Sequence, residues 1–216
     1  MKVTIMPEYE SQGVLVTQEG KFVDRNSFPG YVQFNLPKEV KALTDACSLS
    51  PKGQHFCQIY DIKHDGDKKW VDIGLPYPDF FVDYKYAPFK VKEQSKREFT
   101  YSVKSEYNVN TLEVHIQKPY RAEDFSIIPA GLNVYEKRDF EYAKYVFKNV
   151  KAGEIKNFTI AYFKADSQPS VDIKYRGRMQ MGVFGDNSGG LLLGAGILLL
   201  GVIVYVRRRK SGTAKS

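Results

Sequence analysis

The sequence predicts an all-β protein, with one or, as the pattern favours, two tandem antiparallel β-sandwich domains before a single C-terminal transmembrane helix. Three observations carry this prediction. Apolar and polar residues alternate in many segments, aromatic residues make up 14% of the chain, and an uncharged apolar run stands near its end. A hydrophobic content of 43% in 216 residues excludes a disordered chain. Two cysteines are too few for a disulfide-dense scaffold or a four-cysteine zinc site.

Four segments upstream of residue 176 alternate with a period of two, as antiparallel strands with one wet face do. Each segment places three large side chains on one face, and we expect these faces to form the core. The four sets are Val32, Phe34 and Leu36; Phe80, Val82 and Tyr84; Leu112, Val114 and Ile116; and Phe158, Ile160 and Tyr162.

The spacing of these sets indicates an internal repeat. The first and third sets stand 80 residues apart, and the second and fourth stand 78 apart. Trp70-Val71 matches Tyr145-Val146 at a spacing of 75 residues. We therefore predict two sandwich domains, the second a repeat of the first, although one larger sandwich is the alternative. The predicted boundaries are 1–88 and 89–175 for the domains and 176–188 for a linker.

A turn from Val150 to Glu154 leads into the alternating strand that begins at Phe158. With this turn and its strand spacing, the chain up to residue 175 resembles the immunoglobulin-like and fibronectin type III-like β-sandwiches of membrane-anchored prokaryotic envelope proteins. The resemblance is one of architecture, because Trp70 follows both cysteines and the Cys–Trp–Cys order of antibody domains is absent. It implies an ectodomain that binds or scaffolds a partner.

Residues 189–206 form an apolar run of 18 residues without a charge. A helix rises about 1.5 Å per residue, so this run covers about 27 Å and can cross a hydrocarbon core. A buried core helix is the alternative, but the flanking residues argue for a membrane span. Tyr205 stands where an interfacial aromatic side chain is expected, and four cations follow, namely Arg207, Arg208, Arg209 and Lys210.

The positive-inside rule places residues 207–216 in the cytoplasm and the preceding domains outside the plasma membrane, in the periplasm or on the cell surface. Residues 1–12 lack the apolar core of a signal peptide. Either a signal has been removed, or the protein is tail-anchored with a cytosolic domain; the basic cluster favours the first. The C-terminal region also resembles glycine-glycine sorting signals whose tail is cleaved, but a retained anchor is expected. Gly190 and Gly194 form a G-x-x-x-G pair, which leaves a weak homodimer open.

The net charge of +7 does not indicate a nucleic-acid-binding surface. Five of the basic residues lie after residue 206, which leaves 27 basic against 25 acidic residues in the rest of the chain. A nucleic-acid site needs a concentrated basic surface. We expect the membrane and a protein of the envelope as partners, and no nucleic acid.

Cys47 and Cys57 are predicted to form a disulfide across a β-hairpin. Pro51 and Gly53 suit a short turn, and in the register that follows, Cys47 faces Cys57. Opposed residues of antiparallel strands are ~4.5–5.5 Å apart, within reach of a disulfide. A disulfide also fits an exported domain, because such bonds persist in oxidising compartments.

No metal site or cofactor is expected. His115 is predicted on the wet face of its strand, and His64 stands in the turn that contains Asp65 and Asp67, which we interpret as solvated turn residues. A periplasmic redox or copper-handling factor, using Cys47 and Cys57 with His55 or methionines near residue 180, is the alternative function.

Catalysis is not expected, because no nucleophile elbow, zinc-protease motif, P-loop or dinucleotide fingerprint is present. Aromatic residues beside prolines are the remaining signal, and exposed ones bind proteins or sugars. A carbohydrate- or wall-binding module is therefore a further alternative, and packing between the two halves is the structural explanation. The candidate binding residues are Tyr77, Phe81, Tyr86 and Phe89. The expected function is that of a single-pass envelope protein whose β-sandwich ectodomain binds or scaffolds a partner, as an accessory subunit of a membrane complex.

Overall fold

The computed structural model describes residues 1–131 and 133–173, and residues Met1–Val171 form one compact unit. The described elements of this unit are all β-strands, which confirms the predicted fold class in its all-β part. The strands are β1 (Lys2–Pro7), β2 (Val14–Lys21), β3 (Gly30–Asn35), β4 (Leu43–Leu49), β5 (His55–Cys57), β6 (Tyr60–Asp65), β7 (Lys68–Leu75), β8 (Asp79–Tyr86), β9 (Ser95–Lys104), β10 (Val109–Gln117), β11 (Glu123–Ile128), β12 (Asn133–Lys137), β13 (Phe140–Val150) and β14 (Ile155–Lys164).

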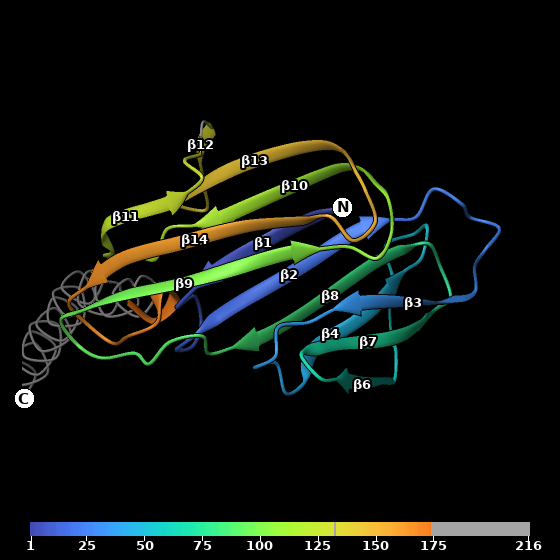
Figure 1. The fold of residues 1–216 in the computed structure, drawn as a ribbon, viewed down its shortest axis with the longest axis horizontal. Helices are drawn as coiled ribbons and strands as arrows, with labels where there is room; N and C mark the ends of the chain where they lie inside the picture. The colour runs from blue at the N-terminus through green and yellow to red at the C-terminus, as the bar shows by residue number, and fades with distance from the viewer. Residues whose placement is uncertain (132, 174–216) are drawn as a thin grey trace, which may run out of the picture. The chain divides into compact units, whose positions relative to one another are not determined.

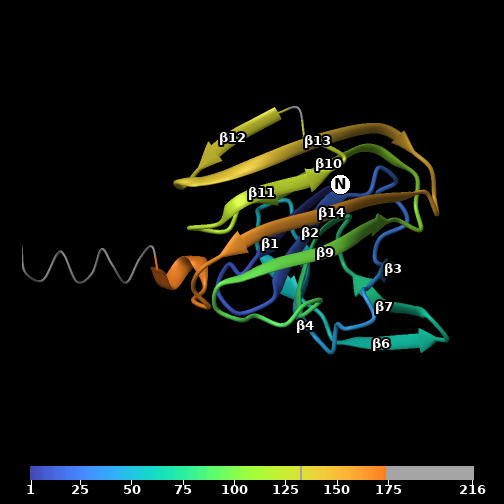
Figure 2. The ribbon, with the colours of Figure 1, turned by 60° about the vertical axis from the view of Figure 1, so that its left-hand side comes forward.

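The strands form one large sheet and two small ones (Figure 1). The large sheet has the order β12-β13-β10-β1-β2-β8-β4-β5, and the small sheets have the orders β11-β14-β9 and β3-β7-β6. In the turned view of Figure 2, β9 and β14 cross in front of β1 and β2.

Both small sheets pack on the same face of the large sheet. Phe34 of β3 contacts Phe80 of β8 with ring centroids 5.0 Å apart, and Phe158 of β14 contacts Tyr145 of β13 at 4.9 Å. Cross-strand partners share a face, and the pairings from β8 through β2, β1 and β10 to β13 place Phe80 and Tyr145 on one face. All twelve side chains predicted to face the core are buried there.

The two halves of the chain repeat the same strand arrangement. The order β2-β8-β4 recurs as β9-β14-β11, and the order β3-β7-β6 recurs as β10-β13-β12, with all neighbours antiparallel. The register shift in β4 between Leu43 and Asp45 recurs in β11 between Glu123 and Ser126. This correspondence supports two copies of one six-stranded unit.

One of the three sequence matches is out of register by one residue. Phe34 pairs with Val71, and its counterpart Val114 pairs with Tyr145, so Val71 corresponds to Tyr145 at a spacing of 74 residues. The predicted spacing of 75 aligned an inward side chain with an outward one, because a slip of one residue exchanges the faces of a strand.

β1 connects the halves within the large sheet. It pairs in parallel with β10 of the second half and antiparallel with β2 of the first half. The large sheet therefore continues across the predicted boundary at residue 88, and the division into two separate domains stays a prediction. Among the described residues no helix is long and apolar enough to cross a membrane, and the predicted span, 189–206, lies outside them.

A buried ionic cluster fixes the end of β1 to the second half. The Glu8 carboxylate lies 3.1 Å from Arg97 Nε and 3.3 Å from Lys164 Nζ, and all three side chains are fully buried. Tyr162 donates a hydrogen bond of 2.9 Å to the same carboxylate. The Arg97 guanidinium also donates to the carbonyl oxygens of Ser95, Lys164 and Asp166.

We expect Glu8→Gln to lower the free energy of unfolding by about 3–5 kcal/mol, because it removes the carboxylate that faces two buried cations. Chemical denaturation of the full chain in detergent measures the change. The matched control is Glu98→Gln, whose partner Lys96 is solvent-exposed and whose loss costs about 1 kcal/mol or less. Equal effects of the two substitutions would contradict this assignment.

Candidate functional site

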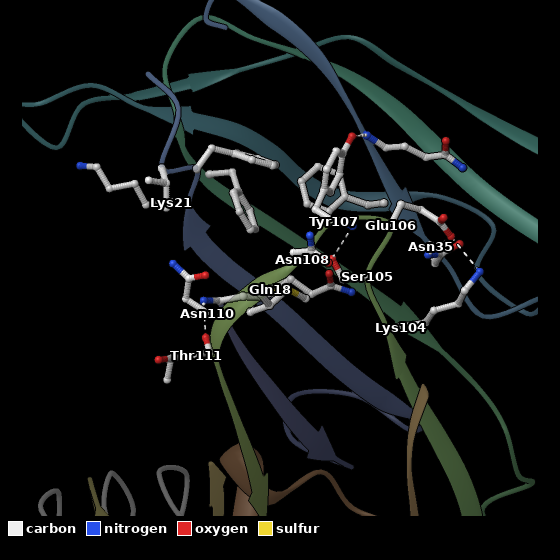
Figure 3. A pocket seen from close by; sticks show the side chains of 17 residues that line it. Gln18, Lys21, Asn35, Lys104, Ser105, Glu106, Tyr107, Asn108, Asn110 and Thr111 are labelled. Carbon is white, nitrogen blue, oxygen red and sulfur yellow. Dashed lines mark hydrogen bonds and ion pairs between the residues drawn. The ribbon is translucent and has the colours of Figure 1, made fainter. Parts of the chain in front are cut away.

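A cavity of about 500 Å³ lies where the two halves meet. Its walls come from β3 and from the segment between the end of β2 and Val23 in the first half, and from the β9–β10 turn, Lys104–Thr111, in the second. Figure 3 shows Asn35, Lys104 and Glu106 on one side of it and Lys21 and Asn110 on the other. Cavities of this size take small ligands or short peptide segments.

Aromatic rings form the apolar wall of this cavity. Phe22 contacts Phe80 with ring centroids 5.6 Å apart and meets Tyr107 edge to face at 5.1 Å. Phe34 packs behind Phe80. Val23 lines the mouth and is 82% exposed, which is unusual for an apolar side chain beside a cavity. The wall therefore offers apolar surface to a ligand.

The opposite wall carries an ordered set of polar groups. The Gln33 backbone N–H donates to the Tyr107 hydroxyl at 2.9 Å. The Glu106 carboxylate accepts from Asn35 Nδ2 at 2.9 Å and from Lys104 Nζ at 2.8 Å. These bonds, that from Lys104 first, lower the pKa of the Glu106 carboxyl group, so this side chain is ionised at neutral pH and its charge is balanced.

A second cavity of about 310 Å³ continues the first one between β3 and β9. The two share Gln18, Asn35 and Lys104 as lining residues, and the second reaches Pro37 and Thr100. We call the two together the cleft. It therefore follows the edges of two small sheets above the large sheet.

Below the cleft lies a buried chain of hydrogen bonds. Gln18 Nε2 donates to the Tyr84 hydroxyl at 3.2 Å, and the hydroxyls of Tyr84 and Tyr101 lie 2.6 Å apart. Burial raises the pKa of Tyr101 to about 12, and burial also raises that of Tyr84, so both stay neutral. Neutral, paired phenols position the floor and offer no base for catalysis.

The predicted disulfide between Cys47 and Cys57 is confirmed. The two residues are direct partners on β4 and β5, and the predicted turn closes with hydrogen bonds between Ser50 and both Gln54 and Gly53. Gly53 has a φ of +76°, the conformation for which glycine was expected there. An Asp45 oxygen lies within 4.8 Å of the two sulfur atoms, the one group of three potential metal ligands among the described residues.

The four predicted binding residues do not form one surface. Tyr86 is buried, and Phe89 packs against Phe99 and Tyr162. Tyr77 and Phe81 are half-buried near the disulfide, where they contact Phe56 and His55 respectively. The predicted membrane-anchor residues, Gly190, Gly194, Tyr205, Arg207, Arg208, Arg209 and Lys210, lie outside the described residues.

The prediction that His115 faces water is wrong. Its side chain is buried, with Nδ1 2.5 Å from the Tyr135 hydroxyl and Nε2 3.2 Å from the Glu113 carboxylate. The strand does point it away from the core, but the neighbouring strand β12 places Tyr135 over it. His64 and the turn after it are as predicted, with Gly66 at a φ of +55°.

Sequence reasoning did not identify the cleft. Its residues come from three separate segments and carry no shared motif, so only the fold brings them together. The one local signal is the run of polar residues around Asn108 and Asn110, between two alternating strands. Such a run is typical of an ordinary turn, and it does not distinguish a binding loop.

Reduction of the disulfide should lower the free energy of unfolding by about 3 kcal/mol without abolishing folding, because the closed loop is short. Thermal unfolding of the full chain with and without reductant measures this as a fall of several degrees in melting temperature. The variant with both Cys47→Ser and Cys57→Ser is the control and should not respond to reductant. An unchanged melting temperature of the reduced native chain would contradict the expectation.

Acidification should weaken the fold through His115. Burial is the largest effect on this group and lowers its pKa, so between this value and about 6.5 the unfolded chain binds the proton and the folded chain does not. Stability from the neutral ring is present above that range and is lost as the pH falls through it. The difference in unfolding free energy between the native chain and His115→Asn should therefore shrink from pH 7.5 to 5.5. A constant difference would contradict this.

Comparison with known proteins adds no relative from which a function could be transferred. No protein-family model matches the sequence, and no curated protein matches it. The cleft between the two halves, rather than a family motif, is the feature from which a function can be proposed.

Proposed function

We propose that this chain is a non-catalytic binding protein, anchored in the plasma membrane by residues 189–206, whose extracytoplasmic β unit holds a partner of the envelope in the cleft. The single observation that carries the proposal is the cleft itself, which joins aromatic walls to paired polar groups at the meeting of two sheet edges. Such a lining is typical of binding sites.

The chemistry of the cleft supports binding rather than catalysis. Its tyrosines near the floor are neutral, and its carboxylate, Glu106, is bonded to both Lys104 and Asn35. A catalytic site needs a nucleophile and a base within reach of each other, or a metal that activates water. The lining residues described above form no such pair.

The disulfide and the terminal charges support the proposed compartment. A disulfide on an edge strand persists where the surroundings are oxidising. The four cations from Arg207 to Lys210 favour a cytoplasmic C-terminus after a membrane span.

The proposed orientation is tested with protease added to intact spheroplasts. We expect digestion of the β unit and survival of an epitope placed at Ser216. Permeabilised cells are the control, in which the epitope is also lost. Protection of the β unit in intact spheroplasts would overturn the extracytoplasmic placement.

The proposed binding site is tested with a photo-crosslinking amino acid in the full chain, in membranes of cells that produce it naturally. We expect a crosslink to one partner from position Val23, at the mouth of the cleft. Ile59 is the matched control, because it is 99% exposed, apolar and outside the cleft lining. Equal labelling from the two positions would contradict a specific site.

A redox or metal-handling role is the second candidate, favoured by the Asp45 oxygen beside the two sulfurs. It requires the two thiols to be free, since a disulfide sulfur is not a thiolate ligand. Thiol titration of the native protein distinguishes the two functions. No reactive thiol is expected from a structural disulfide, and two reactive thiols would favour the second candidate.

A further inference from the structure

The cleft has a counterpart in the fold that is filled by a strand. In the repeat, β10 corresponds to β3, and β2 corresponds to β9. Between β10 and β2 lies β1, which pairs with both. Between β3 and β9, the described residues contain no strand, and the cleft lies there instead.

The strand directions at the two junctions also agree. β1 runs parallel to β10 and antiparallel to β2. Figure 1 shows that β3 and β9 run in opposite directions, as this arrangement requires of their counterparts. A strand that entered the cleft could therefore lie parallel to β3 and antiparallel to β9.

The edge of β3 offers hydrogen-bonding groups to such a strand. The N–H of Leu36 donates to Lys69, next to β7, whereas the N–H of Gln33 points away from β7 and donates to the Tyr107 hydroxyl. Backbone groups at a sheet edge readily pair with an added strand. A peptide carbonyl could take the place of the Tyr107 hydroxyl on Gln33.

The floor of the cleft leaves room for side chains of an added strand. At the junction occupied by β1, the strand below is β9, which presents Phe99 and Tyr101. Their counterparts on β2, by pairing with Val82 and Phe80, are the smaller Gln18 and Gly20. β1 buries Val3 and Ile5 at alternate positions, and the cleft would receive its ligand in the same way.

We propose that the cleft binds an extended segment of a partner polypeptide, apolar at every second residue, as an added strand between β3 and β9. This deepens the proposed function and rests on it. The exposed Val23 at the mouth and the balanced charge of the polar wall favour an apolar peptide over a charged ligand.

The first test uses a fluorescent peptide with the sequence of residues 1–8, because β1 fills the corresponding junction. Anisotropy with the full chain in detergent micelles should show saturable binding. The control peptide carries Val3→Asp and Ile5→Asp and should bind at least tenfold more weakly. Equal binding of the two peptides, or no binding of the first, would overturn the proposal.

Substitutions on β3 test whether the peptide uses its edge. Gln33→Pro removes the N–H that faces the cleft but no bond to β7, so the strand should persist, and we expect roughly tenfold weaker binding. Gln33→Asn keeps the N–H and should bind within about twofold of the native chain. Tyr107→Phe removes the competing hydroxyl and should tighten binding by roughly two- to tenfold. Since it acts in the opposite direction, it keeps the test valid if Gln33→Pro fails to fold.

A disulfide trap tests the direction. The register of β1 places Thr4 beside His115, whose counterpart is Asn35, so a Thr4→Cys peptide should crosslink to Asn35→Cys. Moving the peptide cysteine to position 8 should abolish the crosslink, and equal yields would overturn the parallel arrangement.

Failure of the strand proposal can be distinguished from failure of the proposed function. If the peptides do not bind but Val23 still crosslinks specifically, the cleft binds a partner by other chemistry, and strand addition is wrong. If soluble oligosaccharides compete for the Val23 crosslink, the ligand is a glycan and the peptide proposal is likewise overturned.

Discussion

The described structure depends on the double pairing of β1. This strand is the one element that joins the first half to the second within a sheet, by a parallel ladder with β10 and an antiparallel ladder with β2. A strand between two others loses both free edges, and Val3 and Ile5 are fully buried as a result. The relative position of the halves, and with it the width of the cleft, follows from this pairing.

The ionic cluster after β1 fixes the same relation at its far end. Glu8 has a positive φ of 43°, which turns the chain out of the strand and directs its carboxylate to Arg97 and Lys164 of the second half. A fully buried ion pair gains little net stability over apolar packing, but a broken one is costly. The cluster therefore specifies one position of the halves more than it adds to overall stability.

The sequence predicted those features of the fold that are written in local patterns. Alternation identified the core faces of β3, β8, β10 and β14, and turn chemistry identified the Cys47–Cys57 hairpin. The repeat emerged from the same patterns, within one residue at Val71. These succeed because strand periodicity and tight turns depend on a few neighbouring residues.

Features that depend on distant segments were not predictable in this way. The burial of His115 depends on Tyr135, twenty residues away, and the burial of Tyr86 depends on sheets packing over it. The pairing of β1 with β10 and the cleft also join segments from opposite ends of the unit. Each half was readable from sequence, and the junction between them was not.

The pairing of β1 also has a consequence for the order of folding. Its first residue, Lys2, pairs with Glu113, so this ladder closes a loop of more than 100 residues, whereas the β6–β7, β12–β13 and β13–β14 turns close within a few. Loop-closure entropy delays such distant contacts, and the neighbouring hairpins form first. During synthesis β1 is made early but has no β10 until half of the chain has followed. Until then, the edge of β2 is bare, and the nascent chain depends on quick completion or on a chaperone to avoid pairing with another molecule.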